Sequence, residues 1–121
     1  MSCSPAMPKG AGPAVALEGV EAVGADLGGF DSCMRVNVPG RKATFQVYMA
    51  GWGRKEQGVC FAVHGAGFTG LSWALVAAHL KESCCVLAPD MRGHGLTETD
   101  DDDDLSAATL VEDMRMLGRV L

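Results

Sequence analysis

The chain has 121 residues, enough for one domain, and its 48% hydrophobic content is enough to build a packed core. Its net charge of −5, from 15 acidic and 10 basic residues, disfavours nucleic acid and acidic membrane surfaces as partners. The sequence shows neither a signal segment nor an apolar run long enough to cross a bilayer. We therefore expect a cytoplasmic protein, with the nucleus as the alternative compartment.

Five cysteines are spread along the chain without a C-x-x-C pair. Their number is odd and three lie in apolar runs, so we expect reduced cysteines that serve as small hydrophobic residues. A zinc site would need ligands clustered at short spacing, which the sequence lacks. The sequence predicts no metal site and no cofactor.

Residues 1–30 are rich in glycine, alanine and proline, which predicts a flexible leader before a domain at 31–121. Two segments of alternating apolar and polar residues then flank Pro39-Gly40. This pattern is typical of an antiparallel hairpin with half-buried strands. A polar loop is expected at 51–58.

Beyond that loop, the runs 59–63 and 84–88 are continuously apolar, as in strands that are covered on both faces. The segment 71–81 between them predicts a helix in which one face is shared by Leu71, Leu75, Ala78 and one of Val76 or His79. Two buried strands joined through a helix indicate a β-α-β unit in a parallel sheet.

A last helix is predicted after the acidic run 100–104, with Ser106 as its N-cap. We expect the acidic run to be a solvated loop. Apolar residues at helical spacing predict the face that packs on the sheet: Leu110, Val111, Met114, Leu117 and Leu121.

The most informative segment is His64-Gly65-Ala66-Gly67, the glycine turn, which directly follows an apolar strand. Its backbone N–H groups can hold a phosphate or the oxyanion of an ester under attack. With the next three residues it also matches G-x-G-x-x-G, and Asp90 follows about 20 residues later. One interpretation is therefore a dinucleotide-binding βαβ unit that uses Gly65, Gly67, Gly70 and Asp90.

Other features favour the oxyanion. A hairpin precedes the motif strand, and the fingerprint gives His64 no role. The next strand leads into Asp90-Met91-Arg92-Gly93-His94-Gly95, the arginine loop. An H-G turn followed by a D-x-R-G-H-G loop resembles the α/β-hydrolases, in which the H-G turn supplies one N–H of the oxyanion hole. The fold class expected is the N-terminal portion of an α/β-hydrolase: an antiparallel hairpin followed by a β-α-β-α parallel unit.

The resemblance narrows to one family. The pieces Leu71-Ser72-Trp73-Ala74 and Asp104-Leu105-Ser106-Ala107, with the stretch 43–48, resemble the protein phosphatase methylesterases. That resemblance covers roughly residues 30–121. It implies a Ser-His-Asp carboxylesterase that removes the methyl ester from the C-terminal leucine of the protein phosphatase 2A catalytic subunit, so the expected partner is a protein substrate. Ala66 departs from the glycine expected there, a change that a backbone donor tolerates.

Ala66 is the candidate oxyanion donor, through its backbone N–H. The other motif residues are expected to shape the turn and the loop: His64, Gly65, Gly67, Asp90 and His94. His64 is not expected to be the catalytic base, because the triad order in this fold places the histidine far downstream of the serine. Trp73 is expected to pack the helix onto the sheet, with pocket lining as the alternative.

No G-x-S-x-G occurs in the 121 residues, so the nucleophile elbow is expected beyond residue 121 and the chain is expected to be truncated and inactive alone. With the hydrolase strand order 1-2-4-3-5, the strand at 59–63 would then lie at an exposed edge of the sheet. Two further alternatives remain: a fragment of another α/β-hydrolase, such as an epoxide hydrolase or a lipase-like enzyme, or a non-catalytic binding remnant.

Overall fold

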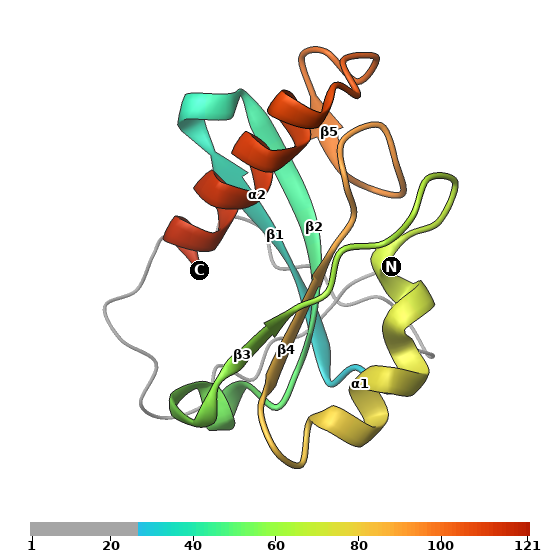
Figure 1. The fold of residues 1–121 in the computed structure, drawn as a ribbon, viewed down its shortest axis with the longest axis vertical. Helices are drawn as coiled ribbons and strands as arrows, with labels where there is room; N and C mark the ends of the chain where they lie inside the picture. The colour runs from blue at the N-terminus through green and yellow to red at the C-terminus, as the bar shows by residue number, and fades with distance from the viewer. Residues whose placement is uncertain (1–26) are drawn as a thin grey trace.

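The computed structural model describes residues 27–121 (Figure 1), so residues 1–26 of the leader predicted at 1–30 lie outside the described part of the chain. The strands and helices follow in the order β1 (Ser32–Val38), β2 (Ala43–Ala50), β3 (Val59–Phe61), α1 (Ala74–Leu80), β4 (Cys85–Pro89), β5 (Glu98–Thr99) and α2 (Ala107–Val120). Three 3-10 segments join them: η1 (Pro39–Arg41), η2 (Trp52–Gln57) and η3 (Gly70–Trp73).

The strands form one mixed sheet in the order β1-β2-β4-β3, and β5 pairs with the start of β2. β1 and β2 are antiparallel, with Ser32 opposite Met49 and Val38 opposite Ala43. β2 is also antiparallel to β4, whereas β3 and β4 are parallel. The predicted hairpin and the predicted parallel unit are therefore confirmed.

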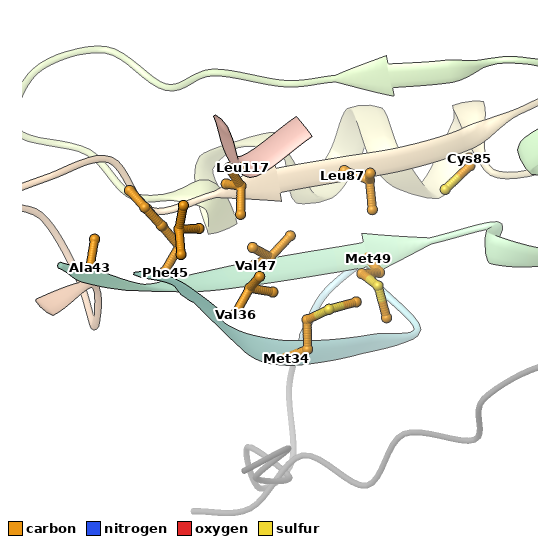
Figure 2. Packing of buried hydrophobic residues seen from close by; sticks show 10 residues of the cluster. Met34, Val36, Ala43, Phe45, Val47, Met49, Cys85, Leu87 and Leu117 are labelled. Atoms are coloured by element: carbon orange, nitrogen blue, oxygen red, sulfur yellow. The ribbon is translucent and has the colours of Figure 1, made fainter. Parts of the chain in front are cut away.

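The two helices cover opposite faces of this sheet (Figure 1). On one face Leu117 of α2 lies among buried side chains of β1, β2 and β4, such as Val36, Phe45 and Leu87 (Figure 2). On the other face Ala77 of α1 packs with a second buried cluster. Its other members are Phe30, Cys33, Tyr48, Ala50, Ala62, Val86 and Ala88. The packed part of the chain thus begins before the boundary expected at residue 31.

Burial along the strands differs from the prediction in two places. Side chains of β2 belong to the buried clusters on both faces of the sheet, so the expectation of a half-buried strand is wrong there: Gln46 and Tyr48 are each 3% exposed. β3 pairs only with β4 among the described residues, and Val59 and Val63 are 46% and 42% exposed. The expectation that 59–63 is covered on both faces is therefore wrong, while its expected place at the edge is confirmed.

The helix predicted at 71–81 is divided into η3 and α1, and its buried face differs from the prediction. Ala77 is fully buried, whereas Leu75 is 83% exposed and Ala78 is also exposed. A 3-10 segment has about 3.0 residues per turn, so η3 rotates the following residues away from the face that a 3.6-residue spacing predicts.

Helix α2 begins as predicted, because the Ser106 side chain accepts a hydrogen bond from Thr109 N at 3.4 Å. Leu117 is fully buried, but Val111 is 66% exposed, so the predicted apolar face is wrong at that position. A charged residue, Asp113, is buried on the helix instead.

Cys60, Cys84 and Cys85 are free thiols, as expected, whereas Cys33 is disulfide-bonded, so the expectation of reduced cysteines is wrong for Cys33. Burial raises the pKa of the Cys85 thiol to about 11. No helix within residues 27–121 has the length and apolar character needed to cross a membrane.

Candidate active site

The glycine turn and the arginine loop follow neighbouring strands. The chain enters the turn after β3 and enters the loop after β4, and these two strands are parallel partners. Parallel neighbours end at the same edge of a sheet, which is where open α/β sheets bind ligands. The structure therefore brings together the two motifs that the sequence analysis singled out.

Residues 65–68 of the turn form a β-turn, closed by a hydrogen bond from Phe68 N to Gly65 O at 3.1 Å. Gly67 at the third position has a φ of 82°, as a type II turn requires. Ala66 at the second position has no such requirement, which explains why a side chain is tolerated there. Ala66 is exposed, and its N–H donates to no acceptor within residues 27–121.

His64 connects the turn to the arginine loop. Its Nε2 accepts from Met91 N at 2.9 Å, and its Nδ1 lies 2.8 Å from Gly65 O. A main-chain N–H can only donate and a carbonyl oxygen can only accept, so these partners assign the neutral ring with its proton on Nδ1. Both ring nitrogens of His64 are thus engaged, and the side chain is only 7% exposed.

His94 makes the reciprocal connection from the loop to the turn. Its Nε2 accepts from Gly67 N at 3.1 Å, and its Nδ1 lies 2.8 Å from Arg92 O. The rings of His94 and His64 stack edge to face, with their centroids 5.0 Å apart. Each histidine therefore accepts an N–H from the other motif and bonds a carbonyl oxygen of its own.

Asp90 is fully buried and uses both carboxylate oxygens inside the protein. Oδ1 accepts from Gly70 N at 2.7 Å, and Oδ2 accepts from Leu96 N at 2.9 Å. Thr97, which sequence reasoning missed, donates its hydroxyl to Asp90 O at 2.7 Å and accepts from Gln46 N. Because the Asp90 carboxylate is fully buried and both of its oxygens accept main-chain N–H groups, a ribose cannot reach it, which counts against the dinucleotide interpretation.

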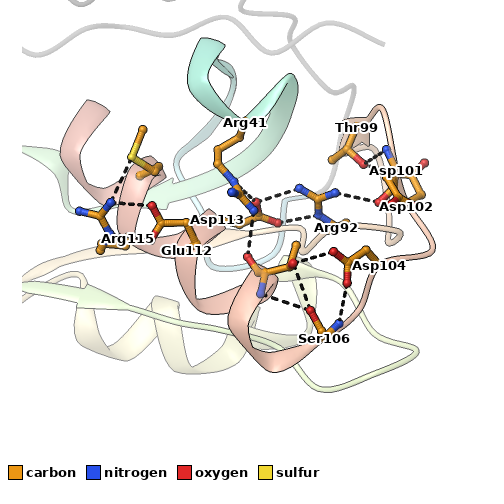
Figure 3. A network of polar contacts seen from close by, with 12 residues as sticks. Arg41, Arg92, Thr99, Asp101, Asp102, Asp104, Ser106, Glu112, Asp113 and Arg115 are labelled. Carbon is orange, nitrogen blue, oxygen red and sulfur yellow. Dashed lines mark hydrogen bonds and ion pairs between the residues drawn. The ribbon is translucent and has the colours of Figure 1, made fainter.

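A buried ion pair anchors the arginine loop to α2 (Figure 3). Asp113 is fully buried and accepts from Arg92 Nε at 2.8 Å and Arg92 Nη2 at 3.0 Å. Arg41 from η1 adds a third bond through Nε at 2.8 Å. The hydrogen bonds to Asp113 raise the pKa of Arg92 above its usual range. The sequence signal that could have identified Asp113 is a charged residue among the apolar positions of a predicted helix.

The acidic run before α2 is exposed at residues 100–103, as expected for a solvated loop, but its last member is engaged at the helix start. Asp104 accepts from Thr109 Oγ1 at 2.6 Å and from Ser106 N at 3.2 Å. These hydrogen bonds, that of Thr109 foremost, lower the pKa of Asp104. Residues 27–121 hold no cluster of three or more side chains suited to a metal ion.

Trp73 lies at the end of η3 and packs against the cluster that contains Tyr48 and Ala77. Its Nε1 is buried and donates to no acceptor in the described part of the chain. The contacts of its ring are therefore packing contacts between η3 and the sheet.

Comparison with known proteins defines the class. Residues 60–120 match the sequence profile described as "Alpha/beta hydrolase family". The crystal structure of a putative lipase from Acinetobacter baumannii AYE shares the fold, with a TM-score of 0.68, 23% identity, and coverage of 78% of this chain and 30% of the lipase. The chain belongs to the alpha/beta hydrolase family, which confirms the fold class predicted from the sequence.

Curated relatives narrow the resemblance within that family. The chain is 37% identical over 90 residues to the probable protein phosphatase methylesterase 1 of Dictyostelium discoideum, covering 69% of this chain and 28% of that protein. It is 40% identical over 87 residues to the probable protein phosphatase methylesterase 1 of Caenorhabditis elegans, covering 70% and 22%. It is 40% identical over 75 residues to protein phosphatase methylesterase 1 of Mus musculus, covering 60% of this chain and 19% of that protein. The predicted resemblance is confirmed, and the chain spans less than a third of the length of these relatives.

Proposed function

We propose that this chain contributes the oxyanion-stabilising turn of a serine carboxylesterase. The observation that carries the proposal is the N–H of the exposed residue Ala66, which has no acceptor within residues 27–121 although hydrogen bonds fix the turn around it. The carbonyl oxygen of an ester gains negative charge when the carbonyl carbon is attacked. A preorganised N–H aimed at that oxygen lowers the barrier.

The other motif residues have a supporting role in this proposal. They hold the turn and the loop at the ends of β3 and β4 without touching the substrate: His64, Gly65, Gly67, Asp90 and His94. Trp73 packs η3 on the sheet. Because both nitrogens of His64 are bonded to main-chain groups, the catalytic base is a different histidine.

The nucleophile is proposed to lie outside these 121 residues. In this fold the second oxyanion donor is the residue after the serine of a G-x-S-x-G elbow. None of the six serines of the chain stands in that context. The serine, its acid and its histidine would therefore come from further residues of the same enzyme, and the 121-residue chain alone is inactive.

The proposed substrate follows from the relatives. They are named protein phosphatase methylesterases, and the substrate we propose is the methyl ester on the C-terminal leucine of the protein phosphatase 2A catalytic subunit. The proposed partner is accordingly a protein, and the proposed location of the reaction is the cytoplasm or the nucleus. No cofactor is needed, because a serine triad and two N–H donors suffice for ester hydrolysis.

The assay uses a gene product that includes this chain and a G-x-S-x-G serine. Methanol release is measured from a peptide with the phosphatase C-terminal sequence and a leucine methyl ester, and compared with hydrolysis of a p-nitrophenyl ester. Turnover of both, with the larger kcat/KM for the peptide, supports the proposal. If only the p-nitrophenyl ester is hydrolysed, the proposed substrate is contradicted. If neither compound is hydrolysed, the proposed esterase activity is contradicted.

A further inference from the structure

The tip of the glycine turn has few restraints apart from its hydrogen bonds. A Cβ placed on Gly67 would meet no atom within 4 Å, and one on Gly65 would meet only Phe68, at 3.7 Å. Three hydrogen bonds therefore set the conformation of this tip: those from Phe68 N and His64 Nδ1 to Gly65 O, and the bond from Gly67 N to His94 Nε2.

The bond to His94 restrains one particular peptide group. Type I and type II turns differ mainly by a flip of their central peptide, which here joins Ala66 to Gly67. Its N–H belongs to Gly67, whose φ of 82° corresponds to type II. A flip would break the bond to His94 and turn the Ala66 carbonyl oxygen toward the lone pair on Nε2, which is repulsive.

The loop in turn fixes the direction of that lone pair. Nδ1 of His94 lies 2.8 Å from Arg92 O, which can only accept, while Nε2 receives the Gly67 N–H, so the ring carries its proton on Nδ1 and offers Nε2 as an acceptor. Arg92 is itself held through its guanidinium group, which bonds the buried Asp113 and Asp101 O. A connected series of bonds thus runs from α2 through the arginine loop to the turn.

We propose that His94 is a positioning residue for the oxyanion turn: its Nε2 accepts the Gly67 N–H and locks the Ala66–Gly67 peptide in the type II orientation, so that the turn keeps the shape in which the Ala66 N–H has no acceptor of its own. The catalytic role of His94 rests on the proposed function. The hydrogen bond between Gly67 and His94 can be tested independently of any ester chemistry.

Two substitutions of His94 distinguish the effect of the acceptor at Nε2 from the effect of losing the imidazole ring. Glutamine reaches about as far as Nε2 and offers an oxygen that can accept from Gly67, whereas asparagine reaches only the position of Nδ1. In the isotope-labelled 121-residue chain, we expect Gly67 amide exchange to be slow in wild type and in His94→Gln. In His94→Asn it should be about tenfold faster, as for the loss of one hydrogen bond. Equal Gly67 exchange in all three chains overturns the inference.

A second measurement needs no variant. Scalar coupling between the Gly67 amide nitrogen and His94 Nε2 in the wild-type chain supports the bond, and its absence overturns the inference even where His94→Asn fails to fold. In a gene product that hydrolyses the ester, His94→Asn should lower kcat about tenfold with KM unchanged, and His94→Gln should restore it. An unchanged kcat in His94→Asn overturns the positioning role, whereas a wild-type protein without turnover contradicts only the proposed function.

Discussion

Arg92 donates two hydrogen bonds to the carboxylate of Asp113, and both side chains are almost completely buried. The pair joins the loop after β4 to α2, and Arg41 brings the hairpin turn to the same carboxylate (Figure 3). Three segments far apart in the sequence thus meet at one charge next to the candidate site.

Asp113→Asn should be strongly destabilising. It leaves the buried Arg92 guanidinium without its counter-ion, and removing one partner of a buried pair costs about 3–5 kcal/mol. Urea unfolding followed by circular dichroism measures the change. Glu112→Gln on the same helix is the control, because Glu112 pairs at the surface with Arg115 and its loss should leave the midpoint unchanged. Equal midpoints for both variants would refute the anchoring role of Asp113.

Gly95→Ala and Gly118→Ala should change stability in opposite directions. Gly95 has a φ of 52°, and a Cβ there would lie 2.1 Å from Asp90 Oδ2, so alanine adds backbone strain of ~1–2 kcal/mol and displaces the carboxylate. Gly118 lies within α2, and a Cβ there meets no atom within 4 Å, so alanine should stabilise by about 0.5–1 kcal/mol. Thermal unfolding of the two variants compares them directly. A neutral Gly95→Ala would show that Asp90 is not confined as described.

Tyr48 should titrate at unusually high pH. Burial, and then the nearby charge of Asp90, raise the pKa of its phenol from 10.0 to about 12. Because the folded-state pKa is raised, the protonated phenol stabilises the fold below pH 10, and this stabilisation is lost as the pH rises from 10 toward 12. Tyr48 is the only tyrosine in the chain, so phenolate absorbance reports on it alone. A midpoint near 10 with circular dichroism still native would contradict its burial.

The 121-residue chain alone should not hydrolyse esters, because it holds one proposed oxyanion donor and no G-x-S-x-G serine. The purified chain is mixed with a p-nitrophenyl ester, and the expected rate equals that of buffer. Turnover that a serine-directed fluorophosphonate abolishes would disprove the assignment of the nucleophile to residues outside the chain.

Local features of the fold could be predicted from the sequence, whereas features that depend on tertiary packing could not. The hairpin, the parallel unit and the Ser106 cap are encoded by alternation, apolar runs and one capping residue. The burial of β2 on both faces depends on packing with distant segments, since Leu117 of α2 and Ala77 of α1 belong to the clusters on its two sides. The exposed Leu75 results from η3, whose tighter winding leaves no periodic signal.

The candidate site divides in the same way. The glycine turn and the arginine loop are contiguous motifs, so their residues could be singled out in advance. The contacts between them, such as Gly67 with His94, arise only when β3 and β4 become neighbours. The buried role of Asp113 needed the tertiary structure, because the sequence does not show which positive charge a helical aspartate meets.

The most direct test of the account concerns the Ala66 N–H. Ala66→Pro removes this donor, and the second position of a type II turn accepts proline, so the turn is expected to survive. Ala66→Gly is the matched control, because it keeps the N–H. In a gene product with esterase activity, Ala66→Pro should lower kcat about 10²–10³-fold while Ala66→Gly stays close to wild type. A wild-type kcat in Ala66→Pro would contradict the central claim that this turn stabilises the oxyanion.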